Sequence, residues 1–130
     1  VNPLESNGDH HRQAWYGCAC CPSQISRFLP SIGNYIYGTS DKALWVNLFI
    51  GNTTEVTIDG KKVVMKQETD YPWDGLVKLT VTSEQPLGKE LRIRIPGWCK
   101  SYTLPVNGNK VDSTTDKGYT VIKRNGEPAT

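Results

Sequence analysis

The sequence has no long hydrophobic run, since no apolar stretch approaches the roughly 20 residues that cross a bilayer. It also has no starting Met, and its first residues have neither the basic start nor the apolar core of a signal peptide. We therefore expect a soluble chain with no membrane partner, taken from the interior of a longer protein. The compartment, whether cytoplasmic, periplasmic or secreted, then depends on an N-terminus that this sequence does not contain.

An excess of charge of one sign is absent as well. The 15 Lys and Arg residues nearly balance the 13 Asp and Glu residues, which leaves a formal net charge of +2. The basic residues are scattered, and the longest clusters are only Lys61-Lys62 and Lys123-Arg124. Such a chain has no electrostatic footprint for a polyphosphate, so a nucleic-acid partner is not expected.

Cysteine is scarce and unevenly placed. Of four cysteines, Cys18, Cys20 and Cys21 lie within four positions, and Cys99 stands alone. Adjacent cysteines are poorly placed to bridge one another, so the spacing is not that of a disulfide framework. It suits a metal site or a reactive thiol better.

The composition favours one β-rich domain. A chain of 130 residues is long enough for one domain with a real core, and its 12 Gly, 8 Pro, 6 Tyr and 4 Trp are typical of a turn-rich β protein.

Residues 1–17 are expected to be irregular. A helix is expected next, with Pro22 at its first position and an apolar repeat limited by Pro30 and Gly33; the repeat consists of Ile25, Phe28, Leu29 and Ile32.

Short strands separated by turn signals follow the helix. Asp59-Gly60 is the clearest hairpin signal, because this dipeptide tolerates the positive φ of a tight primed turn. The expected strands are 34–37, 44–50, 54–58, 61–67, 77–82, 91–95, 102–106 and 119–122. We predict a mostly β fold, an antiparallel β-sandwich of jelly-roll type over residues 34–130.

The chemistry-bearing segment lies just before the expected helix. Cys20 and Cys21 directly precede Pro22, so they lie at the helix N-terminus, where unpaired N–H groups stabilise a thiolate. Zinc takes four ligands, so this pair supplies at most half a site. Further candidate ligands are Cys18, Cys99, His10, His11 and Glu5, none at a recognised zinc spacing. From the residues alone, the alternative that the cysteines are small buried hydrophobes stays open.

Successive motifs resemble one family across nearly the whole chain. They are Asn2-Pro3-Leu4-Glu5-Ser6, His11-Arg12-Gln13 with Trp15, Cys18-Ala19-Cys20-Cys21-Pro22 with Arg27, Tyr35-Ile36-Tyr37, Leu44-Trp45-Val46-Asn47-Leu48, and Arg92-Ile93 with Pro96-Gly97-Trp98-Cys99. The double Cys before Pro22 and the Pro-Gly-Trp element are the specific ones. The chain resembles glycoside hydrolase family 127, the β-L-arabinofuranosidase group, formerly a domain of unknown function.

This resemblance implies a domain organisation and a mechanism. Residues 1–33 would be the last stretch of an (α/α)₆ barrel that carries the active site, and residues 34–130 the first sandwich, packed against that missing barrel. Cys20 would be the nucleophile and a zinc ligand, and Cys21 a second zinc ligand. A Glu and a Cys from an earlier segment would complete the zinc site, and a separate upstream Glu would be the general acid and base of a retaining glycosidase.

The remaining positions have less specific interpretations. His11, Trp15 and Tyr16 could line the sugar pocket, or be ordinary loop residues. Trp45, Trp73 and Trp98 read as sandwich core or domain-interface aromatics, Arg92 and Arg94 as the solvated face of a strand, and Cys99 as structural. After Arg124 the chain departs from the family pattern, which suggests that the sandwich is truncated.

Three hypotheses follow. In the first, the chain is a fragment of a β-L-arabinofuranosidase-like enzyme that acts on a plant-type arabinose-containing glycan; the parent holds zinc, while the isolated fragment binds it weakly or not at all and is inactive. In the second, the sandwich is an accessory carbohydrate-binding or packing module without catalysis. In the third, the cysteines form a purely structural zinc knuckle.

Overall fold

The structure is a computed structural model that describes residues 17–123, and the chain divides into two compact units, Val1–Ile32 and Gly33–Thr130. In the first unit, helix α1 spans Cys20–Ser31 and carries no buried residue. It begins two residues earlier than predicted, so that Pro22 lies third in the first turn, where its missing N–H is still harmless. The assignment of residues 1–33 to a helical barrel stays a prediction. None of the described helices has the length and apolarity needed to cross a membrane.

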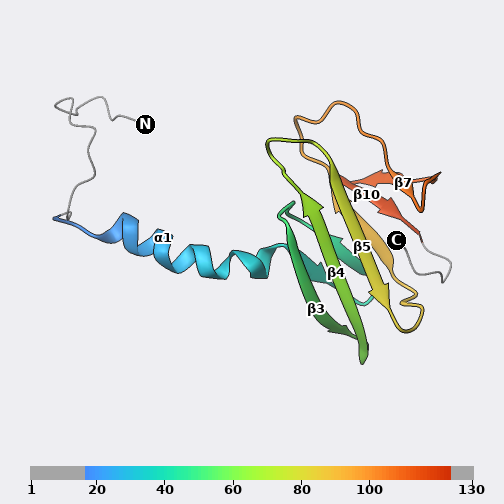
Figure 1. Cartoon of the computed structure of the whole chain (residues 1–130), viewed down its shortest axis with the longest axis horizontal. Coiled ribbons are helices and arrows are strands. Elements are labelled where there is room, and N and C mark those ends of the chain that lie inside the picture. The colour runs from blue at the N-terminus through green and yellow to red at the C-terminus, as the bar shows by residue number, and fades with distance from the viewer. Residues whose placement is uncertain (1–16, 124–130) are drawn as a thin grey trace. The chain divides into compact units, whose positions relative to one another are not determined.

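The second unit is a mostly antiparallel β-sandwich, as predicted (Figure 1). A short 3₁₀ helix, η1 (Ile32–Tyr35), takes most of the place of the expected strand 34–37. The strands are β1 (Tyr37–Thr39), β2 (Ala43–Val46), β3 (Asn52–Ile58), β4 (Lys61–Thr69), β5 (Val77–Ser83), β6 (Glu90–Arg94), β7 (Pro105–Val106), β8 (Asn109–Lys110), β9 (Thr114–Asp116) and β10 (Tyr119–Ile122).

These strands form two larger sheets and a small ribbon. One sheet has the order β1-β2-β6-β10-β9, the other the order β3-β4-β5, and β7 pairs with β8. All pairs are antiparallel except β2 with β6, which run parallel with Leu44 beside Leu91. The prediction of antiparallel pairing is therefore wrong for this one pair. The chain leaves β2, forms β3, β4 and β5 of the other sheet, and then returns as β6 beside β2 in the same direction.

The core lies between the two larger sheets. Val63 and Met65 from β4 are 0% exposed, and Val46 from β2 is 1% exposed. The same cluster contains Leu44, Ile58, Val81, Leu91 and Ile122. Alternation along the strands produces this arrangement, since Leu79 and Val81 of β5 pack in or against this cluster while Lys78 and Thr82 are exposed.

Primed turns close two hairpins. Asp59 and Gly60 both have positive φ, 52° and 73°, and they close the predicted hairpin between β3 and β4. Asn107 and Gly108 do the same for β7 and β8. Strand β9 was not predicted, because Thr114–Asp116 has no apolar alternation and is exposed throughout.

The side chain of Lys89 connects the turn before β2 with the β3–β4 hairpin through its polar contacts. Its side chain is only 4% exposed, and its Nζ donates to the carbonyls of Ser40 and Asp41 at 2.8 Å and pairs with Asp59 Oδ2 at 3.0 Å. We expect Lys89→Met to lower the free energy of unfolding by about 1–3 kcal/mol, because two carbonyls lose their donor. Chemical denaturation of the chain would measure this. Lys62→Met, at an exposed lysine of the same hairpin, is the control, and equal loss in both variants would contradict the assignment.

Candidate functional site

Two adjacent thiols occupy the first turn of α1. Cys20 is the first residue of the helix and Cys21 the second, and both are exposed. Ala19 makes no side-chain cap, the first turn contains no acidic residue, and N–H groups of a first turn have no intrahelical acceptor. The N-terminus of α1 therefore has no carboxylate of its own in the turn that carries the two thiols.

The separation of the two sulfurs fits one zinc ion. Two thiolates at about 2.3 Å from a tetrahedral zinc lie about 3.8 Å from each other. The Sγ atoms of Cys20 and Cys21 are 3.7 Å apart. The pair can therefore supply two of the four ligands of a tetrahedral site.

The structure brings no third ligand to this pair. Within residues 17–123 no group of three or more Cys, His, Asp or Glu side chains is placed to hold a metal. Cys18 is exposed, and Cys99 lies in the sandwich unit, where its Sγ donates to the carbonyl of Ser101 at 3.2 Å. The other predicted ligands and pocket residues, Glu5, His10, His11, Trp15 and Tyr16, lie outside the described residues.

The alternative that the cysteines are small buried hydrophobes stays a prediction. Cys18, Cys20 and Cys21 are all exposed, and α1 buries none of its residues. A pattern cannot separate these outcomes, since a cysteine at a helix start is compatible with either burial or exposure.

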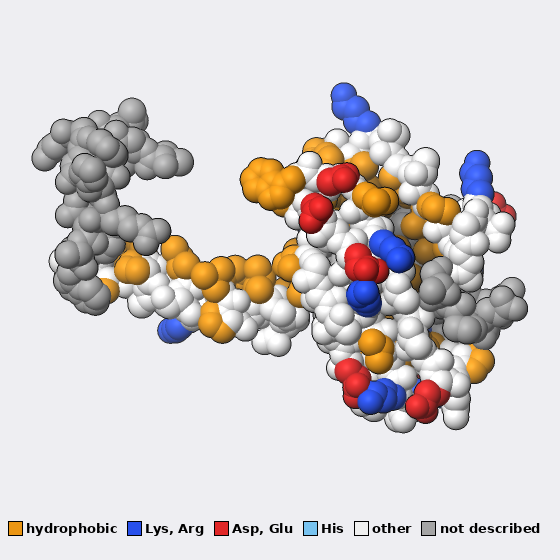
Figure 2. Space-filling view, viewed as in Figure 1, with side chains coloured by type: hydrophobic (Ala, Val, Ile, Leu, Met, Phe, Trp, Pro, Cys, Tyr) orange, Lys and Arg blue, Asp and Glu red, His pale blue; other side chains and the backbone are white. Residues whose placement is uncertain are grey.

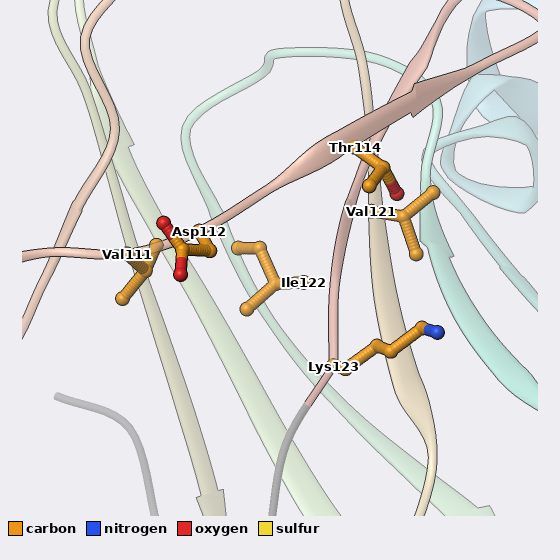
Figure 3. Close-up of a pocket in the computed structure, with 6 residues that line it drawn as sticks. All are labelled: Val111, Asp112, Thr114, Val121, Ile122 and Lys123. Carbon is orange, nitrogen blue, oxygen red and sulfur yellow. The ribbon is translucent and has the colours of Figure 1, made fainter.

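A pocket on the sandwich contains none of the predicted site residues. It lies beside β9 and β10 (Figure 3) and is lined by Val111, Asp112, Thr114, Val121, Ile122 and Lys123. The described residues of its lining include a single carboxylate, no thiol and no aromatic ring. It therefore offers neither a nucleophile paired with an acid nor a ring face for a sugar.

Two tryptophans do not lie in the sandwich core, which was one of their two predicted places, and Arg92 differs from its predicted role. Trp73 is 92% exposed and Trp98 69% exposed, so neither belongs to the sandwich core. Arg92 is not simply solvated, since it pairs with Glu90 and Asp116 and lies over the ring of Trp45. Asp116 and then Glu90, which accept its hydrogen bonds, hold the pKa of Arg92 above its ordinary value. This cluster is a cross-strand contact on the sheet.

Comparison with known proteins identifies the family. Residues 43–129, about two thirds of the chain, match the family described as beta-L-arabinofuranosidase, GH127 middle domain. The chain belongs to GH127. The resemblance read from the sequence motifs is thereby confirmed.

Several GH127 relatives match most of the chain. It is 36% identical to a non-reducing end beta-L-arabinofuranosidase of Bifidobacterium longum subsp. longum, over 94% of the chain and 21% of that protein. A solved GH127 beta-L-arabinofuranosidase from Geobacillus stearothermophilus T6 has a TM-score of 0.80 at 47% identity, over 87% of the chain and 18% of that structure. A second solved GH127 beta-arabinofuranosidase has a TM-score of 0.80 at 38% identity, over 95% and 22%. The chain thus spans about a fifth of the length of these relatives.

Proposed function

We propose that the chain is part of a retaining β-L-arabinofuranosidase in which Cys20 is the nucleophile and Cys20 and Cys21 are zinc ligands. The observation that carries the proposal is the exposed pair of sulfurs, 3.7 Å apart on the first turn of α1, in a chain of the GH127 family. Family membership supports glycoside hydrolysis. The thiol pair supplies the chemical group that could perform it.

The local structure prepares Cys20 for nucleophilic attack. Cys20 is the first residue of α1, and its exposed side chain is open to a substrate. Ser23 holds the turn, since its hydroxyl donates to the carbonyl of Cys20 at 3.1 Å and its N–H to the carbonyl of Ala19 at 3.1 Å. A bound zinc ion would keep the thiols deprotonated at neutral pH.

The reaction takes two displacements. The sulfur of Cys20 forms a bond to the anomeric carbon while the glycosidic C–O bond breaks, and the leaving oxygen takes a proton from a general acid. Water, deprotonated by the same group, then attacks the anomeric carbon, and the C–S bond breaks to regenerate the thiolate. Two inversions give overall retention. We place the general acid, a Glu, outside this chain.

The proposed substrate is an arabinose-containing glycan of plant type, cleaved at its non-reducing end. The described residues place no carboxylate beside Cys20 and no third zinc ligand. We therefore expect the isolated chain to be inactive and to bind zinc weakly, while the full-length parent carries the activity.

Trapping the covalent intermediate tests the proposal directly. We expect rapid acid quenching of the parent protein during turnover of an aryl β-L-arabinofuranoside to yield a peptide whose Cys20 carries one pentosyl group. Peptide mass spectrometry detects the adduct, and NMR of the first-formed sugar shows whether the β configuration is retained. A product of inverted configuration, or an active enzyme whose adduct lies on another residue, would refute the assignment.

A further inference from the structure

Three thiols lie within four positions at the start of α1, and the proposed mechanism uses only two of them. Cys18 precedes the helix by two residues, and it is exposed like Cys20 and Cys21. Figure 2 shows hydrophobic side chains, the class in which cysteine is coloured, along the visible face of α1. A third exposed thiol that is neither the proposed nucleophile nor a proposed zinc ligand is a candidate for redox chemistry.

The conformation of Ala19 brings Cys18 close enough to Cys20 for a disulfide. A disulfide joins Cα atoms that are usually about 4.4–6.8 Å apart. A fully extended residue separates the Cα atoms of its two neighbours by about 7 Å, which is too far. Ala19 has a φ of −90° and a ψ of 16°, in the compact bridge region, so the Cα atoms of Cys18 and Cys20 are only about 6 Å apart.

The adjacent pair, Cys20 and Cys21, is less suited to such a bond. The Cα atoms of neighbouring residues are about 3.8 Å apart across a trans peptide, which is below the usual range for a disulfide. The two sulfurs are 3.7 Å apart, whereas bonded sulfurs are about 2 Å apart, so both thiols are reduced. Cys18 is therefore the better partner for an oxidised Cys20.

The direction of Cys20 and the freedom of Cys18 favour the same bond. The Cα–Cβ bonds of a helix tilt toward its N-terminus, so that of Cys20 is tilted toward the segment that contains Cys18. The N–H of Ser23 donates to the carbonyl of Ala19 and holds that residue in place. Between residues 17 and 123, by contrast, Cys18 makes no backbone hydrogen bond, so its ψ angle can rotate to aim the thiol.

We propose that Cys20 is a site of reversible oxidation and that Cys18 is its resolving thiol. The two form a disulfide when hydrogen peroxide oxidises the thiol pair in the absence of zinc. Formation of this bond does not require Cys20 to be the nucleophile. Its effect on catalysis, a reversible loss of the nucleophile and of one zinc ligand, rests on the proposed function.

The oxidation takes two balanced steps. The sulfur of Cys20 attacks one oxygen of hydrogen peroxide, the O–O bond breaks, and the products are a sulfenic acid on Cys20 and one water. The sulfur of Cys18 then attacks the sulfur of Cys20, the S–O bond breaks, and the hydroxyl leaves as a second water with the proton of the Cys18 thiol. A dithiol reductant regenerates both thiols by thiol–disulfide exchange.

Disulfide formation and zinc binding need the same sulfur, so bound zinc should protect Cys20 from peroxide. Without a neighbouring thiol, a sulfenic acid persists and can be oxidised further to a sulfinic acid, which thiol reductants do not reverse. Cys18 removes the sulfenic acid before that step. It therefore preserves the proposed nucleophile in a form that a reductant can restore.

Peptide mass spectrometry of the full-length parent tests the proposal. Cleavage after arginine releases residues 13–27 as one peptide, which contains the three clustered cysteines and no other. After a chelator removes zinc and about one equivalent of hydrogen peroxide is added, we expect alkylation to label only Cys21 in most copies of this peptide. Dithiothreitol should restore the labelling of all three cysteines. Parent protein that retains zinc should keep all three labels.

Two variants make the result specific. In Cys18→Ser the disulfide should be lost, and sulfinic acid at Cys20 should become about tenfold more abundant and persist in dithiothreitol. Cys99→Ser removes a thiol of the sandwich unit, whose Sγ donates to the carbonyl of Ser101, and should behave like the wild type.

Each other outcome overturns the proposal. A disulfide that contains Cys21, or one that joins Cys20 to a cysteine elsewhere in the parent, would show that Cys18 is not the resolving thiol. Equal amounts of sulfinic acid in the wild type and in Cys18→Ser would show the same. Three labelled cysteines after peroxide treatment would show that Cys20 is not a redox site. If Cys20 proves not to be the nucleophile, the labelling result stands and only its link to enzyme activity is lost.

Discussion

Replacing Cys20 with serine in the full-length parent is expected to lower kcat for an aryl β-L-arabinofuranoside by at least about three orders of magnitude. A serine hydroxyl stays protonated at neutral pH and is a much weaker nucleophile than a thiolate. Serine is also a poor zinc ligand, so the zinc content should fall. Steady-state kinetics and metal analysis of the same preparation measure both effects.

Cys18→Ser is the matched control for this experiment. It removes an exposed thiol only two residues away and should keep both activity and zinc. Cys21→Ser should lose zinc and activity together, whereas only Cys20 should carry the pentosyl group in the trapping experiment. If Cys20→Ser turns over substrate at the wild-type rate, the cysteine is not the nucleophile and the proposed function fails.

Met65→Ala should destabilise the sandwich more than any surface substitution. Met65 is 0% exposed and packs in the cluster shared by both larger sheets. Truncation of such a side chain leaves a cavity, so we expect the free energy of unfolding to fall by about 2–5 kcal/mol. Urea denaturation of the 130-residue chain, followed by tryptophan fluorescence, would measure the change.

Val64→Ala provides the comparison, because Val64 is the next residue on β4 and points to the other face of the sheet. Its loss should cost less than about 1.5 kcal/mol. If both variants were destabilised equally, the assignment of the inner face would be wrong.

Sequence patterns predicted the features that depend only on residues near one another in the chain. The β3–β4 hairpin follows from Asp59-Gly60, whose positive φ values are tolerated by these residue types, and from the alternation on either side. The inward residues of β5 follow from the same alternation. The helix start was placed within two residues, which was enough to predict that Cys20 and Cys21 lie at the helix N-terminus.

Patterns were insufficient where burial depends on distant parts of the chain. Trp73 and Trp98 resemble core residues in a sequence, but both are exposed at one end of the sandwich. A 3₁₀ helix, Ile32–Tyr35, takes most of the place of the strand expected at 34–37. Arg92 lies on an outward strand position, yet Trp45, Glu90 and Asp116 contact it because β2, β6 and β9 belong to one sheet.

Sequence alone therefore determined the β-rich class, the tight hairpin, the family and the position of the thiol pair at a helix start, since each depends on neighbouring residues or on a contiguous motif. Tertiary structure decided the parallel pairing of β2 with β6 and the contacts that Tyr71 makes with Phe49 and Trp98. The physical reason is that these features join residues far apart in the chain, and no local periodicity encodes such pairings.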